Sequence, residues 1–142
     1  MRSRVAGARR RDRRGRGLRG PLTPPQAPVS RTRAERFDDI VRDQVSRLEG
    51  RWGRELAQVE FAVEEVPDLE PWFDGVIPLG QTVPGTTGRP VRIVVFRRPV
   101  EARTSGDDQL SRLVRDLLVE EIADLLGVTP ESVDPSYDTP ED

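Results

Sequence analysis

Apolar residues recur at helical spacing near residue 40 of this chain. Phe37, Ile40, Val41, Val45 and Leu48 are three or four positions apart, as on one face of an amphipathic helix. The segment Thr32–Glu35 matches a capping box, with threonine at the N-cap and glutamate three residues later. The pattern therefore predicts a helix that begins near Thr32 and ends at Gly50, where glycine supplies a stop signal.

Residues 107–126 form the clearest predicted helix. Its apolar stripe consists of Leu110, Leu113, Val114, Leu117, Leu118, Ile122, Leu125 and Leu126. Asp107 and Asp108 suit the positive N-terminal end of a helix dipole, and Gly127 lies where a glycine C-cap is expected. Beyond it, Thr129-Pro130-Glu131 can start one more turn, with proline at the first helical position.

Two segments show the patterns of strands. Val59, Phe61 and Val63 alternate with more polar positions up to Pro67, and Val91–Phe96 is nearly continuous in β-branched residues before Pro99. Residues 67–90, rich in proline and glycine, are predicted to cross irregularly between them, with one short strand at Val76–Ile77. This order of elements predicts an α+β fold, a small sheet packed against an N-terminal helix and the long helix 107–126.

Charge divides the chain unevenly. Residues 1–33 contain eleven arginines and one acid, and residues 34–142 contain twelve arginines and twenty-four acids. The basic segment has almost no apolar residues to bury, so we expect a disordered tail at 1–31, a domain at 32–135 and an acidic end at 136–142. The tail can attract nucleic acid through phosphates, but it has no aromatic residue for base stacking; the alternative is a solvated tail without a partner.

The chain contains no cysteine and no histidine. Disulfides and thiol chemistry are therefore excluded, which fits a reducing compartment. No apolar run is long enough to cross a bilayer, and residues 1–30 lack the apolar stretch of a secretory signal. These observations predict a cytoplasmic protein without a membrane partner.

Three carboxylates lie on or beside the apolar stripe of the long helix. On a helical wheel Glu121 falls inside the stripe, and Glu120 and Asp124 share one face at its edge. A buried charge must be paired, protonated or bound to a cation. Two interpretations follow: Glu120 and Asp124 are solvated while Glu121 pairs with an arginine such as Arg97, Arg98 or Arg112, or the three acids form a cation or ligand site.

Five segments together resemble one family. In order they are Arg36–Val41, Val59–Val66 followed by proline, Gly75–Leu79, Ile93–Pro99 and Val114–Val128. Over residues 36–135 they are similar to the small zincin-like (minimal zincin) metallopeptidases of bacteria. Glu120-Glu121-Ile122-Ala123-Asp124 stands where that family has His-Glu-x-x-His. The resemblance implies a minimal zincin-like fold.

The resemblance also implies a role for each acid. Glu120 and Asp124 stand at the two zinc-ligand positions, and Glu121 stands at the general base. The third ligand position lies downstream, at Glu131 or Asp134. We interpret Glu121 as a vestigial base, and Glu120, Asp124 and Asp134 as vestigial or weak metal positions.

The departure from the family motif is decisive for zinc. Tetrahedral zinc sites use mainly cysteine and histidine, so we expect no zinc and no other cofactor, with weak Mg²⁺, Mn²⁺ or Ca²⁺ binding as the exception. The preferred interpretation is a non-catalytic pseudoenzyme that binds a peptide or protein; the alternative is a divalent-metal hydrolase or peptidase with an all-carboxylate site. In such folds an extended chain can add to a sheet edge. Arg97, Arg98 and Arg103 could assist there, or could be ordinary charges that protect an edge strand.

Overall fold

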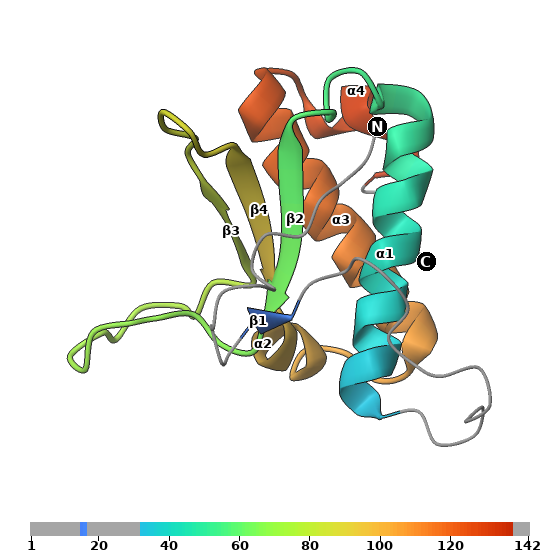
Figure 1. The fold of residues 1–142 in the computed structure, drawn as a ribbon. Helices are drawn as coiled ribbons and strands as arrows, with labels where there is room; N and C mark the ends of the chain where they lie inside the picture. Colours follow the sequence, from blue (N-terminus) through green and yellow to red (C-terminus); the bar gives the residue numbers. More distant parts are fainter. Residues whose placement is uncertain (1–14, 17–31, 138–142) are drawn as a thin grey trace.

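The computed structural model describes residues 15–16 and 32–137. Its elements along the chain are β1 (Gly15–Arg16), α1 (Arg33–Trp52), β2 (Val59–Glu64), β3 (Gly80–Val83), β4 (Val91–Phe96), α2 (Arg97–Glu101), α3 (Asp107–Leu126) and α4 (Pro130–Val133). The predicted α+β class is confirmed: a small sheet lies against the long helices α1 and α3 (Figure 1).

Local signals determine where the helices begin and end. The Thr32 hydroxyl accepts the Glu35 N–H at 3.0 Å, and the Glu35 carboxylate accepts the Thr32 N–H at 3.1 Å, so the capping box is formed. The predicted end at Gly50 is wrong, because α1 continues to Trp52. The Trp52 indole N–H donates to the Val133 carbonyl at 2.9 Å, a tertiary contact that holds this last turn against α4.

The long helix α3 has the bounds that the sequence predicts. It ends at Gly127, whose φ of 73° lies in the left-handed region that favours glycine. Thr129 then caps α4 by accepting the Ser132 N–H at 3.2 Å, with Pro130 at the first helical position. The short turn predicted after Gly127 is therefore confirmed.

The sheet has the strand order β1-β2-β4-β3. β2 and β4 are parallel, in a register that runs from Val59 opposite Val91 to Glu64 opposite Phe96. β3 is antiparallel to β4, with Gly80 opposite Val95 and Thr82 opposite Ile93. The chain therefore goes from β2 past β4 to the edge, forms β3, and returns to fill the central position.

The crossing between β2 and β4 and the segment after β4 differ from the prediction. The expected strand at Val76–Ile77 is wrong, since the strand in this crossing is β3, which includes Gly80 and Gln81 and has little apolar alternation. Pro99 does not follow an extended segment but lies within the first turn of α2, where its missing N–H would have no helical partner in any case.

One hydrophobic core lies between the helices and the sheet. Its largest fully buried members from α1, β2, β4 and α3 are Phe37, Val41, Leu48, Phe61, Ile93, Leu118 and Ile122. Every member that the two central strands contribute to this cluster is at an alternate position, as expected for one sheet face. The core fixes α3 relative to the sheet, and so fixes where the carboxylates of α3 lie.

The predicted disordered tail, residues 1–31, lies outside the described residues except for the pair that forms β1. Most of the predicted acidic end, from residue 138 onward, also lies outside them. Among the helices of the described residues, none combines the length and the apolar character that a membrane span requires.

Candidate functional site

The edge strand β3 lies directly against the motif-bearing helix α3. A Cβ atom on Gly80 would come within 2.9 Å of the Val94 carbonyl oxygen and 3.1 Å of the Leu117 side chain. Real Cβ atoms essentially never come as close to a backbone atom as the first of these distances, and the second is tight, so glycine permits β3 to pack at this distance. As a result, the next inward-facing residue of β3, Thr82, reaches α3 one turn beyond Leu117.

Glu121 meets this strand. Its carboxylate accepts a hydrogen bond from the Thr82 hydroxyl at 2.5 Å, and its side chain is half-buried. Within the described residues Glu121 therefore contacts a strand hydroxyl, which differs from the interpretation in which it pairs with an arginine such as Arg97, Arg98 or Arg112. Arg97, for example, pairs with Glu65 and Glu101.

The other two motif acids point elsewhere. Glu120 is exposed and accepts a hydrogen bond from the Tyr137 hydroxyl, which follows α4. Asp124, one helical turn later, is also exposed and makes no hydrogen bond or ion pair within the described residues. The i, i+4 spacing does place Glu120 and Asp124 on the outer side of α3, but only Glu120 is held by a partner.

Asp134 is the most constrained acid of the predicted set. It is buried, and its carboxylate accepts hydrogen bonds from Arg47 Nη2 at 2.7 Å and from the backbone and hydroxyl of Ser136 at 3.0 and 2.8 Å. Burial alone would raise the pKa of Asp134, but the hydrogen bonds from Arg47 and Ser136 outweigh it and lower that pKa to about 2. The charged carboxylate therefore joins the end of α4 to α1.

The acids at the predicted metal positions are engaged by protein donors or exposed to solvent. Glu120 is bonded to Tyr137 and Asp134 to Arg47, while Glu131 is exposed on α4. Within the part of the chain that the structure describes, no three histidine, cysteine or acidic side chains are grouped so that they could hold a metal ion. The donors that stand at the family's ligand positions do not fit zinc, since they are carboxylates already engaged by protein donors or turned to solvent.

The outer edge of β3 is open. The Phe96 N–H donates to the Leu79 carbonyl at 2.9 Å, and the ladder alternates from that pair. Leu79 and Gln81 therefore direct their backbone groups toward β4, while Gly80 and Thr82 direct theirs outward. No described strand covers that side of β3, so the outward N–H and C=O groups of Gly80 and Thr82 lie along an open sheet edge.

The three arginines expected near a sheet edge differ in their freedom. Arg97 donates to Glu65 at 2.5 Å and to Glu101 at 3.0 Å; the hydrogen bond to Glu65 is the main cause that raises the pKa of Arg97. Arg98 is exposed, with Nε 3.6 Å from the same Glu65 carboxylate. Arg103 has no ion pair within the described residues.

The sequence pattern missed Thr82 and Tyr137, the two hydroxyl donors of the site. Thr82 lies in a strand that has no clear apolar alternation, and it is 39 positions from Glu121. Tyr137 is the single tyrosine of the chain, in the segment that was expected to form an acidic end beyond the domain. Neither contact has a local signal, because both depend on how β3 and the chain after α4 return to α3.

Comparison with known protein families identifies a match. The family model described as zincin-like metallopeptidase matches residues 54–138. This span includes all of β2, β3, β4 and α3, and with them Thr82, the motif acids and Tyr137. A search of the curated proteins found no significant match.

Proposed function

This chain belongs to the zincin-like metallopeptidase family, and we propose that it is a non-catalytic member that binds an extended peptide or protein segment. The observation that carries the proposal is the contact between Glu121 and Thr82, beside the open edge of β3. The residue at the family's general-base position is held by a strand hydroxyl, and the backbone next to it is free to pair.

The donor set argues against peptidase chemistry that depends on zinc. The chain has neither histidine nor cysteine, and within the described residues no three acidic side chains are grouped so that they could hold a metal ion. Ca²⁺ takes six to eight oxygen ligands, and Mg²⁺ takes six in octahedral geometry, several of them usually waters. Glu120 and Asp124 alone would offer a weak site, and Asp134 would have to leave Arg47 and Ser136 to join them.

The edge of β3 provides what peptide binding needs. A chain that adds to a sheet edge gains main-chain hydrogen bonds, and side-chain pockets then give it specificity. The backbone groups of Gly80 and Thr82 face outward, and Val83 is 37% exposed on the same short strand. We infer that the peptide lies alongside β3 and in front of Glu121, and that Glu121 and Glu120 contribute to recognition.

Two substitutions at one position test the binding mode. Thr82→Val and Thr82→Pro both remove the hydroxyl that contacts Glu121, but only proline removes the outward N–H, which takes no part in the ladder with β4. Peptides selected from a phage-displayed library of random linear peptides serve as the probe, and affinity is measured by titration calorimetry. Binding should weaken by at least about tenfold in Thr82→Pro relative to Thr82→Val, which corresponds to about 1.4 kcal/mol.

Equal affinities for the two variants would show that the peptide does not pair with β3. Thermal unfolding of both variants checks that the strand remains in the sheet. The alternative function, a divalent-metal hydrolase, is tested with labelled casein in the presence of Mn²⁺ or Mg²⁺. Hydrolysis that is lost in Glu121→Gln would overturn the non-catalytic proposal and establish Glu121 as a working base.

A further inference from the structure

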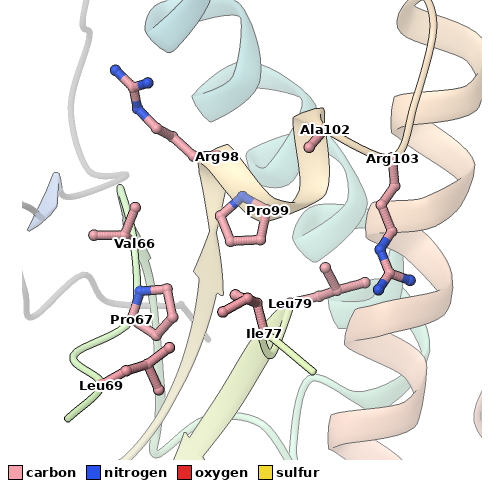
Figure 2. Close-up of a pocket in the computed structure, with 9 residues that line it drawn as sticks. All are labelled: Val66, Pro67, Leu69, Ile77, Leu79, Arg98, Pro99, Ala102 and Arg103. Carbon is pink, nitrogen blue, oxygen red and sulfur yellow. The ribbon is translucent and has the colours of Figure 1, made fainter. Parts of the chain in front are cut away.

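A pocket of about 510 Å³ lies at the end of the sheet, away from Glu121. Its apolar walls come from Val66, Pro67, Leu69, Ile77, Leu79 and Pro99. Figure 2 shows the two sides: the chain leaving β2 on one, the chain entering β3 on the other, and α2 between them. We call this pocket the α2 groove.

The chemistry of the α2 groove selects for an apolar and negatively charged occupant. The guanidinium of Arg103 lies beside Leu79 at one end of the groove, whereas Arg98 extends away from it (Figure 2). Arg103 has no ion pair in the described residues, so its charge is available to a carboxylate. In a segment with an apolar side chain next to an acid, the apolar side chain would pack against the walls and the acid would pair with Arg103.

Such a segment occurs on the molecule itself. The chain between β2 and β3 projects from the body (Figure 1), and every residue from 68 to 77 is exposed. Trp72 and Val76 are 77% and 78% exposed, and Phe73 is 40% exposed. Asp68, Glu70 and Asp74 are interspersed among them, without a basic residue. A tryptophan presented in this way is typical of a contact surface.

One copy cannot use this loop to fill its own groove. The base of the loop, through Val66, Leu69 and Ile77, is already a wall of the α2 groove, while the tip points away from the body (Figure 1). We propose that the occupant is the loop tip of a second copy of this chain, with Trp72 against the apolar walls and the adjacent acids near Arg103. The exchange is reciprocal, since each copy carries both halves and a two-fold axis closes the contact.

The test measures self-association of the full chain and two variants. Trp72→Ser removes the apolar tip, and Ala102→Glu adds a bulky like charge to an exposed position that lines the groove. Sedimentation equilibrium from roughly 1 μM to 1 mM should show a monomer–dimer equilibrium for the parent chain. Each variant should dimerise at least about tenfold more weakly, and the matched exposed apolar substitution Val128→Ser should change nothing.

Mixing the two variants distinguishes loop exchange from a general effect. A heterodimer of Trp72→Ser with Ala102→Glu retains one intact contact, because the good loop of one copy meets the good groove of the other. The mixture should therefore associate more strongly than either variant alone. The same measurement is repeated in high salt, which abolishes attraction between the basic tail and the acidic domain. Dimerisation that persists in high salt is therefore not due to that attraction.

Three results would overturn the proposal. These are a parent chain that stays monomeric throughout the concentration range, a dimer that is indifferent to both substitutions, and a mixture that associates no better than its components. Larger species in place of a dimer would mean that the contact is head-to-tail and does not close, which also contradicts the reciprocal exchange.

Discussion

Asp134 and Glu121 are both acids of the region that resembles a metallopeptidase site, but they occupy different surroundings. Asp134 is 4% exposed and receives one arginine and two donors from Ser136. Glu121 is half-buried and receives one hydroxyl, from a strand whose other edge is open. The first carboxylate holds two helices together, and the second lies next to a surface that another chain can reach.

This difference assigns the two acids of the motif region different roles, one in stability and one in binding. Removing either a buried charge or one of its several donors is costly in stability. A half-buried carboxylate with a single donor can exchange that donor for water or for a ligand at little cost. Asp134 should therefore matter for stability, and Glu121 should matter for binding. Four measurements can sharpen or break this assignment.

The largest effect is expected for Arg47→Met. The substitution keeps much of the length of the side chain but leaves the Asp134 carboxylate buried without its cation. Because the Arg47 side chain is itself 47% exposed, the free energy of unfolding should fall by about 2 to 3 kcal/mol, less than for a fully buried pair. Arg51→Met, in the last turn of the same helix and exposed, is the matched control and should cost little. Denaturant unfolding at neutral pH measures both. A loss below about 1 kcal/mol would mean that Ser136 alone satisfies Asp134.

The second effect is a loss of stability in acid. The folded-state pKa of Asp134 is about 2, below the ordinary value of 3.8, so the unfolded chain binds its proton first as the pH falls. The contribution is complete above about pH 4 and disappears as the pH falls toward 2; it should amount to about 2 kcal/mol. Unfolding curves of the parent chain and Asp134→Asn, compared across this range, should converge at low pH. Parallel curves would contradict the low pKa.

Local sequence patterns predict some elements of this fold and not others. The capping box at Thr32, the bounds of α3 and the strands β2 and β4 follow from local spacing, and the structure confirms them. β3 was missed because Gly80 and Gln81 interrupt its alternation. Its position is fixed by the close contact of Gly80 with Leu117, which depends on the whole fold.

Site partners were harder to predict than elements. The wheel angle placed Glu121 inside the apolar stripe, and the structure has it half-buried, but neither an arginine pair nor a cation site, the two interpretations of this position, indicates its contact with Thr82. Arg47 is 87 positions from Asp134, and nothing in either segment indicates the pairing. Side-chain partners at such separations are set by packing of α1, α3 and α4, so a single sequence gives no signal for them.

The third measurement concerns Glu121→Leu. Because the partner of Glu121 among the described residues is a hydroxyl that can turn to water, the free energy of unfolding should change by no more than about 1 kcal/mol, in either direction. Thr82→Val should have a similarly small effect, and the double variant should show whether the two are coupled. A loss near 3 kcal/mol in Glu121→Leu would place Glu121 with Asp134 as a structural acid and would remove the contrast between them.

The smallest effect is expected at the exposed contact between Tyr137 and Glu120. Both groups reach solvent, so water replaces the hydrogen bond when Tyr137→Phe removes the hydroxyl, and the loss should stay below about 1 kcal/mol. Glu120→Gln should cost a similar amount, and a double-mutant cycle should give a coupling within that limit. If the coupling exceeded about 2 kcal/mol, the segment after α4 would be fastened to α3 through Glu120, and Glu120 would belong with Asp134 among the acids that hold the fold together. A small coupling leaves Glu120 free to exchange Tyr137 for a ligand, as the peptide-binding proposal requires.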